Sequence, residues 1–231
     1  MENSTNDSSD KLAPKRINYA YVRDQILGLF NLEKGVFFSI GILLINPGRG
    51  VREYLHEDRT RMMKPILFLA LSSALFLAIT FLTGTTYNFL KIEGFTFFDY
   101  HYKASGFSTF LNSNLIYLNL VLILFISIWA RIFFRRSKYN VFEIVTVLSF
   151  LFGEALLFFS IPILVLKLFK LHFNATLLWF PYVIYLVYGL ESFFADRGKR
   201  ILNGLKVLST YLIGFVTYLV FMLILTVLLG K

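Results

Sequence analysis

Long runs of apolar residues dominate this chain, and short polar segments separate them. Five of the runs have the length of a membrane span, because a hydrocarbon core about 30 Å thick needs roughly 20 helical residues to cross it. The five predicted spanning helices cover residues 65–83, 115–134, 143–166, 171–190 and 207–229. The sequence therefore predicts an all-α fold, a polytopic membrane helix bundle that occupies residues 65–231.

The segment before the first run alternates short apolar stretches with charged residues and never reaches spanning length. Residues 15–64 are therefore expected to form amphipathic helices at the membrane surface. The stretch from Val36 to Ile45 suits an interfacial or re-entrant helix, which Asn46-Pro47-Gly48 then ends. Residues 1–14 are rich in Ser, Asn, Asp and Lys, and we expect them to form a disordered cytoplasmic tail.

Positive charges fall on alternate connections between the runs. Lys and Arg number 10 in residues 1–64, 4 in residues 131–138 and 4 in residues 197–206, whereas the opposite side carries five. Cytoplasmic loops of membrane proteins carry the excess of Lys and Arg. We therefore expect a multi-pass protein of the cell's inner (plasma) membrane, with its N-terminus in the cytoplasm and its C-terminus outside.

Composition excludes several classes of protein. At 57% hydrophobic residues, with 27 Phe, the chain is too apolar for an ordinary soluble core. It has no cysteine, which excludes disulfides and thiolate catalysis, and three scattered His residues do not make a usual metal site. No metal or cofactor is expected. We attribute the net charge of +9 to topology and anionic lipid rather than to nucleic acid.

Short motifs in the surface segment resemble a known family. Asn46-Pro47-Gly48, Arg52-Glu53-Tyr54-Leu55 and Arg59-x-Arg61-x-x-Lys64-Pro65 follow the signature of an uncharacterised bacterial multi-pass membrane family, domain of unknown function 3667. Further matching positions are Tyr139, Glu143, Tyr188-Gly189, Lys206 and Tyr211. Many members of that family open with a four-cysteine zinc ribbon, which this chain lacks. The resemblance implies a membrane protein without an established reaction. The chain is also similar, more weakly, to the five-pass Yip family of membrane-trafficking proteins.

Glu154 is the one acidic residue near the centre of a predicted span. A carboxylate at that depth costs about 3 kcal/mol on insertion scales, so it should be protonated, paired or exposed to a watery cavity. Aligning the spans by their midpoints gives one polar layer of Glu154, Ser72, Ser73, Tyr182, Thr217 and Tyr218. Two interpretations stay open: a proton or cation relay or substrate anchor, and a neutral acid that hydrogen-bonds neighbouring helices. Either interpretation predicts a hydrogen bond from Glu154 to this layer.

Basic residues next to the spans form a second candidate site. Eight of them make up a predicted cytoplasmic collar for anionic lipid headgroups: Arg49, Arg52, Arg59, Arg61, Lys64, Arg135, Arg136 and Lys138. Arg131 and Glu143 flank the hairpin between the second and third spans, and we expect them to form an interfacial ion pair. Carboxylate pairs of glycosidase type, nucleophile elbows and phosphate loops do not occur, so no catalytic residue is predicted.

Three functions compete on these grounds. The sequence favours a noncatalytic scaffold, assembly partner or lipid-interacting protein, with the bilayer and its anionic phospholipids, a second copy or another membrane protein as partners. The first alternative is a small channel or transporter that uses Glu154, and the second is a membrane-organising protein of the Yip kind. An enzyme is disfavoured, because only Glu154, His101 and His172 could act as an acid or base.

Overall fold

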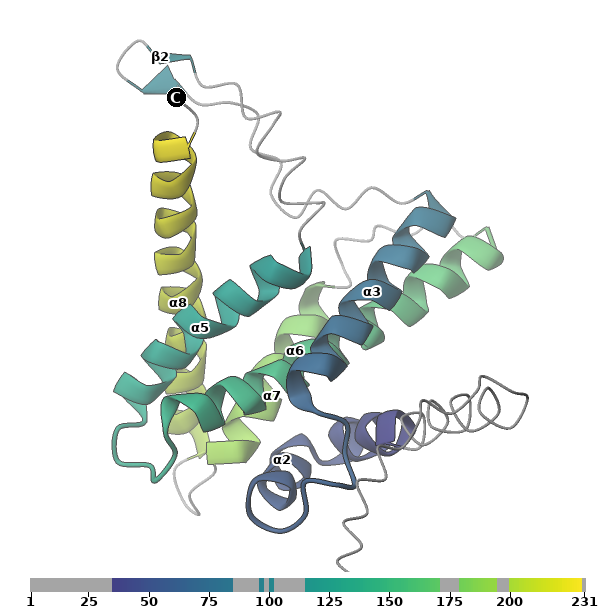
Figure 1. Ribbon diagram of the computed structural model, residues 1–231, viewed down its shortest axis with the longest axis vertical. Helices are drawn as coiled ribbons and strands as arrows, with labels where there is room; N and C mark the ends of the chain where they lie inside the picture. Colours follow the sequence, from purple (N-terminus) through teal and green to yellow (C-terminus); the bar gives the residue numbers. More distant parts are fainter. Residues whose placement is uncertain are drawn as a thin grey trace, which may run out of the picture.

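The fold was analysed in a computed structural model, which describes residues 35–84, 96–97, 100–101, 115–170, 179–194 and 200–229. Within these residues the protein is all-α, as predicted, apart from a two-residue antiparallel pairing of β1 (Thr96–Phe97) with β2 (Tyr100–His101) (Figure 1). The predicted disordered tail and the first part of the surface segment lie outside the described residues, as does the beginning of the predicted fourth span.

The described helices are Gly35–Ile45, α2 (Pro47–His56), α3 (Pro65–Thr83), α5 (Leu115–Phe133), α6 (Val141–Leu168), α7 (Trp179–Phe194) and α8 (Arg200–Leu229). Three of them are long and apolar enough to cross a membrane, namely α3, α6 and the part of α8 from Ile201 to Leu225, with mean hydropathy of 2.4, 2.2 and 2.2. The apolar parts of α5 and α7 with described side chains, Tyr117–Phe133 and Phe180–Phe194, are shorter. The structure therefore establishes three helices of membrane length among the described residues.

Helix ends follow local chemistry rather than the limits of the apolar runs. At the start of α6, the Asn140 side chain accepts the Glu143 N–H, and the Glu143 carboxylate accepts the Asn140 N–H, which makes a capping box. Helix α3 begins with Pro65 at its first turn and ends at Gly84, whose φ of 62° places it in the left-handed conformation that favours glycine. Helix α8 begins seven residues before the predicted span, because a helix can continue through the polar headgroup region.

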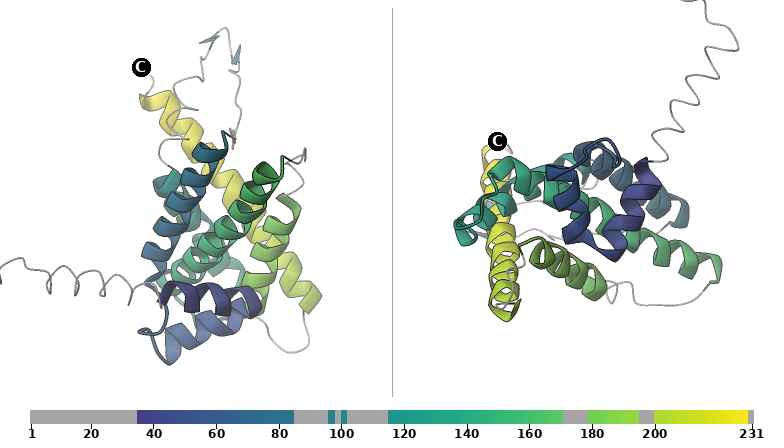
Figure 2. Two further views of the ribbon diagram at one scale, coloured as in Figure 1. Left: turned by 90° about the vertical axis from the view of Figure 1, so that its right-hand side faces the viewer. Right: turned by 90° about the horizontal axis from the view of Figure 1, so that it is seen from below.

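Helix α6 occupies the middle of the bundle. In its most apolar stretch 72% of residues are buried, against 33% for α3 and 28% for α8. It packs against α3, α5 and α7, while α8 packs against α5 and α7 (Figure 2). Rings pair in ascending order along α3 and α6, Phe68 with Phe150 and Phe76 with Phe159, so these two helices run parallel. The outer faces of α3 and α8 consequently remain apolar and exposed.

Two small residues allow the central helices to approach closely. A Cβ atom added at Gly153 of α6 would lie 2.7 Å from a ring carbon of Phe68 and 3.3 Å from the Cα of Leu69 on α3. A Cβ added at Gly214 of α8 would lie 2.9 Å from the Cα of Ile126 on α5. Small residues commonly provide such contacts between membrane helices. The α3–α6 and α5–α8 pairs therefore depend on glycine at these positions.

The Gly153→Ala substitution should destabilise the bundle by about 1–3 kcal/mol, because it overpacks the α3–α6 contact. The matched control is Gly204→Ala on α8, where an added Cβ has no atom within 4 Å and alanine is the better helix former. Thermal unfolding of both variants in the same detergent measures the difference. Equal melting temperatures for the two variants would contradict the close packing at Gly153.

Candidate functional site

Glu154 lies on α6 and is 1% exposed. It follows Leu151 by three residues and precedes Phe158 by four, so the three side chains share one face of the helix. That face packs on α7, because Leu151 fills the space beside Gly189 and the Phe158 ring stacks on Tyr185 with 5.9 Å between centroids. The acid therefore points into the protein, between α6 and α7, and away from the lipid-facing surface.

One carboxylate oxygen of Glu154 lacks the hydrogen bond that we expected. Its Oε2 atom is buried and has no hydrogen-bond partner. The Ser72 hydroxyl on α3 is likewise buried without a partner. Tyr185 lies close enough to interact electrostatically with Glu154, but its hydroxyl donates to the Leu43 carbonyl at 3.2 Å. The hydrogen bond that we expected from Glu154 to the polar layer is therefore not seen at Oε2 and stays a prediction for the carboxyl as a whole.

The predicted polar layer divides between two parts of the bundle. Ser73 on α3 accepts a weak hydrogen bond from the amide of Asn119 on α5, at 3.5 Å. Thr217 accepts the indole N–H of Trp129 at 3.2 Å, and Tyr218 packs edge-on against Phe125, so both belong to the α5–α8 contact. Helices at one depth need not present their polar side chains to each other.

Tyrosines on α7 and α8 form contacts of their own near Glu154. The Tyr182 ring packs edge-on against Phe159 of α6, with 5.9 Å between centroids. The Tyr211 hydroxyl donates to the Leu186 carbonyl at 3.0 Å and so ties α8 to α7. Among the described residues no group of three metal-ligating side chains occurs. The side chains packed on the Glu154 face of α6 are thus mainly aromatic and aliphatic, and the Tyr185 and Tyr211 hydroxyls donate to backbone carbonyls.

The strongest polar contacts lie at one end of the bundle, where α2 docks on the end of α7. A Cβ atom at Gly48 would collide with the backbone carbonyl of Ser192, so glycine permits the backbones to touch. Arg52, one helical turn later, donates from Nη1 to the Ser192 and Phe193 carbonyls at 2.6 and 3.0 Å. These are carbonyls of the last turn of α7, which otherwise lack helical partners. Arginine also complements the negative end of the helix dipole.

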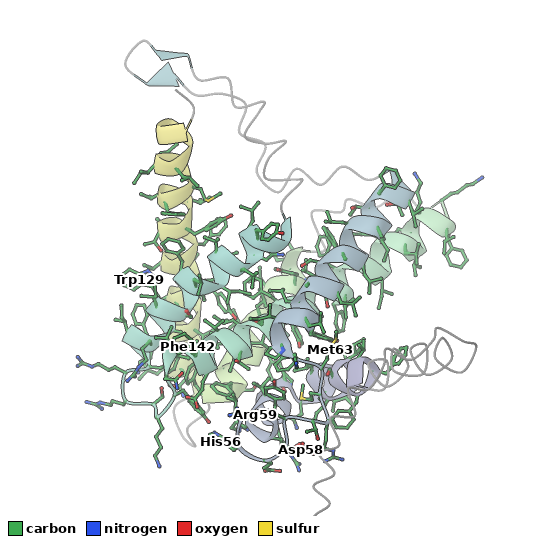
Figure 3. All side chains as sticks on the ribbon, in the orientation of Figure 1. His56, Asp58, Arg59, Met63, Trp129 and Phe142 are labelled. Atoms are coloured by element: carbon green, nitrogen blue, oxygen red, sulfur yellow. The ribbon has the colours of Figure 1, made fainter. Side chains whose placement is uncertain are left out.

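Aromatic rings close the bundle beside this docked helix. Tyr139 packs on Phe193 at 4.4 Å between centroids, His56 of α2 lies 5.8 Å from Tyr139, and Phe134 stacks on Phe194 at 4.1 Å. Burial raises the pKa of the Tyr139 phenol, so this hydroxyl stays neutral. Figure 3 shows His56 at the lower end of the molecule, where α2 lies. We call this end, with α2, the α5–α6 turn and the end of α7, the basic end.

The eight basic residues of the predicted collar make different contacts in the structure. Arg52 is a structural cap of α7 and is not free to bind lipid. Arg49 pairs with Glu53 at 2.6 Å, and the Arg59 guanidinium reaches the Leu55 carbonyl at 3.3 Å. Arg61 lies over the Phe38 ring, 5.2 Å from its centroid. The remaining four members are exposed, namely Lys64, Arg135, Arg136 and Lys138.

Two further observations at the basic end differ from what the sequence predicted for its charged residues. The expected ion pair of Arg131 with Glu143 is absent from the described contacts, because Glu143 caps its own helix and Arg131 donates to the Arg135 carbonyl at 3.0 Å. The Thr60 hydroxyl donates to the Asp58 carboxylate at 2.6 Å, and the Thr60 N–H donates to it at 2.8 Å. Both hydrogen bonds lower the pKa of Asp58, the hydroxyl bond more than the N–H bond. Asp58 is therefore an anion that offsets part of the basic charge.

Sequence analysis missed Asn119, Tyr185 and the capping role of Arg52. Asn119 carried a usable signal, since an amide inside an apolar run calls for a partner on a neighbouring helix. Tyr185 carried none, because its acceptor is a backbone carbonyl of a separate surface helix, Leu43. Arg52 was assigned from its charge alone, whereas Gly48 one turn earlier places it against backbone.

Glu154→Leu should raise the melting temperature in detergent, because a buried carboxyl without a hydrogen bond costs about 1–3 kcal/mol. Glu154→Gln keeps the shape and polarity and serves as the matched control, with little change expected. Thermal unfolding of the wild type and both variants gives the answer. A lower melting temperature for Glu154→Leu would mean that the carboxyl has a stabilising partner and would contradict the structure.

The comparisons with known proteins point to the docked segment. The model of a family described as Protein of unknown function (DUF3667) matches residues 33–77. This range holds the helix Gly35–Ile45, all of α2 and most of α3. None of the curated proteins and none of the solved structures matches the chain significantly. The similarity to the Yip family stays a prediction, whereas over residues 33–77 the resemblance to the domain of unknown function 3667 family is confirmed.

Proposed function

We propose that this chain is a noncatalytic, five-pass membrane protein whose basic end binds the anionic headgroups of phospholipids in the cytoplasmic leaflet. The observation that carries the proposal is a gathering of exposed cations from two separate segments. Lys64 lies just before α3, and Arg135, Arg136 and Lys138 lie in the α5–α6 turn. The ring contact of His56 with Tyr139 joins the α5–α6 turn to the end of α2, eight residues before Lys64.

Five crossings are supported by how the shorter helices pack. Helix α5 has 19 residues and packs on α6 and α8, while α7 packs on α6 and α8. Both therefore lie among helices of membrane length. The C-terminal end of α8 lies at the opposite end from α2 (Figure 1). An odd number of crossings suits that separation, and the excess of Lys and Arg assigns the basic end to the cytoplasm.

Charge at the basic end favours anionic lipid as the ligand. Each Lys or Arg near an anionic membrane surface contributes about 1 kcal/mol of binding free energy. The pairing of Arg49 with Glu53 and the anionic Asp58 lower the net charge around α2, so the α5–α6 turn supplies the larger share. We therefore expect the three cations of that turn to dominate headgroup binding.

Transport is the second candidate, and it depends on Glu154 alone. The carboxyl is kept in the interior with Oε2 unbonded, which costs stability and is typical of functional residues. Against transport, the groups around it are aromatic and aliphatic, and the nearby Tyr185 hydroxyl bonds to backbone. A cation or proton pathway would need further polar groups, so we prefer the lipid-binding scaffold.

Reporter fusions test the proposed topology. Fusions after Ser137 and Lys199 should report a cytoplasmic location, and a fusion after Lys103 should report the exterior, because positive loops stay in the cytoplasm. Activities of paired cytoplasmic and exterior reporters at each position provide the measurement. An exterior signal at Ser137 would overturn the assignment of the basic end.

Lipid retention tests the headgroup site. The triple variant Arg135→Gln, Arg136→Gln and Lys138→Gln should retain at least tenfold less phosphatidylglycerol relative to phosphatidylcholine, because three cations at about 1 kcal/mol each are lost. Mass spectrometry of lipids that copurify in mild detergent measures the ratio. The matched control removes two exposed cations at the other end, Lys167→Gln and Lys170→Gln, and should leave the ratio unchanged. Equal ratios for the triple variant and the wild type would sink the proposal.

A further inference from the structure

The helix Gly35–Ile45 has one face built into the protein. Ser39 is fully buried, and its hydroxyl accepts the Met63 N–H at 3.0 Å while donating to the Gly35 carbonyl at 2.7 Å. Leu43 is also fully buried, and its carbonyl accepts the Tyr185 hydroxyl. Ser39 and Leu43 are one turn apart, so they define a single inward face. These contacts fix the rotation of the helix about its own axis.

The opposite face is apolar and exposed. Phe37 is 71% exposed, Phe38 38%, Leu44 45% and Ile45 78%. Spacings of one, seven and eight residues place these four side chains on one side of a helix, centred on Gly41. A Cβ atom added at Gly41 would meet no atom within 4 Å. We call Phe37, Phe38, Leu44 and Ile45 the outer stripe.

Water is an unsuitable solvent for this stripe. Each Å² of apolar surface left in water costs about 25 cal/mol, and no charged residue occurs between Gly35 and Ile45. With 11 residues the helix is also too short to cross a bilayer, which requires roughly 20. A short helix that is apolar on both faces, with one face against protein, fits the acyl boundary of a membrane.

We infer that the helix Gly35–Ile45 is an in-plane membrane anchor, whose outer stripe inserts among phospholipid acyl chains directly beneath the headgroups. This inference deepens the proposed function, because it adds an acyl-chain contact beside the headgroup site. Two neighbouring features identify lipid as the occupant. Arg61 lies over the Phe38 ring and so places a cation at the edge of the stripe. Ile66 and Leu67, at the start of α3, continue the exposed apolar surface with 57% and 44% exposure.

The arrangement explains how one surface meets both parts of a lipid. In this arrangement Arg61 and the exposed Lys64 lie at the level of the headgroups, and the outer stripe lies beneath them among the acyl chains. Figures 2 and 3 show the helix Gly35–Ile45 crossing the basic end beside Met63, rather than standing parallel to the long helices. An in-plane helix of this kind gains binding energy from buried apolar area and from attraction to anionic lipid together.

Spin labels on single cysteines measure the depth of the stripe, and the chain has no native cysteine to remove. The full-length variants Phe37→Cys and Ile45→Cys carry the label, and Arg49→Cys, at an exposed position of α2, is the water-facing control. Each is reconstituted into vesicles of phosphatidylglycerol and phosphatidylcholine. At positions 37 and 45 collisions with oxygen should exceed those with a soluble nickel chelate several-fold, and at position 49 the order should reverse.

Two other results for the labels at positions 37 and 45 would overturn the inference. Labels at positions 37 and 45 that collide freely with the nickel chelate would place the stripe in water. Labels shielded from both oxygen and the chelate would place it against protein, such as a second copy. Headgroup binding is measured separately by lipid retention, so a shallow stripe with normal retention rejects the anchor alone, and a deep stripe with lost retention rejects the headgroup site alone.

Substitutions at Gly41 give a second test that leaves the inward face intact. Gly41→Leu and Gly41→Gln both fit the open space, and both are better helix formers than glycine. Leucine extends the outer stripe, so the ratio of oxygen to nickel collisions at position 45 should rise about twofold or more. Glutamine places an amide in its centre, so the ratio should fall. An unchanged ratio in both variants would contradict insertion.

Discussion

The docking of α2 on the end of α7 is the contact on which the basic end depends. Gly48 lets the backbone of α2 touch that of Ser192, and Arg52 then satisfies two carbonyls that the last turn of α7 leaves open. A half-buried guanidinium bonded to two carbonyls is a strong contact, because a charged donor roughly doubles the strength of a hydrogen bond. Once α2 is placed, Tyr54 meets Phe150 of α6 and His56 meets Tyr139. The surface helices are therefore part of the folded bundle.

The residues that carry the family resemblance are mostly residues of helix contact. Gly48, Arg52 and Tyr54 attach α2, and outside the matched range Lys206 lies over the Phe134 ring and Tyr211 bonds the Leu186 carbonyl. Every one of these contacts joins two helices near the basic end or along α7. What the pattern specifies is accordingly an arrangement of helices, and this suits a scaffold better than a reaction centre.

The sequence predicted a helix in each of the five apolar runs, but it did not predict the contacts between these helices. The first predicted span coincides with α3, because an uninterrupted apolar run begins at Pro65 and a left-handed glycine follows at Gly84. The members of the predicted polar layer contact different helices, because hydropathy predicts the depth of a residue but not the direction in which its helix is turned. The Glu154 face of α6 packs on α7, whereas Thr217 bonds to Trp129 of α5. The expected ion pair of Arg131 with Glu143 is replaced by contacts to nearby backbone groups. Arg131 donates to the Arg135 carbonyl, and Glu143 accepts the Asn140 N–H.

In the proposed arrangement the basic end meets both lipid and water, and this accounts for its composition. The inward face of the helix Gly35–Ile45 needs hydroxyl and carbonyl partners, since a buried backbone group without one is costly, and Ser39 and Tyr185 supply them. Its outward face needs none, because Phe37, Leu44 and Ile45 carry no polar atoms in their side chains. In the proposed arrangement a cation such as Arg61 is tolerable only where the two regions meet, and its guanidinium lies over the Phe38 ring at the edge of the outer stripe. The proposed depths of the two helices therefore explain the order of residues in this segment, with the apolar helix first and the basic helix second.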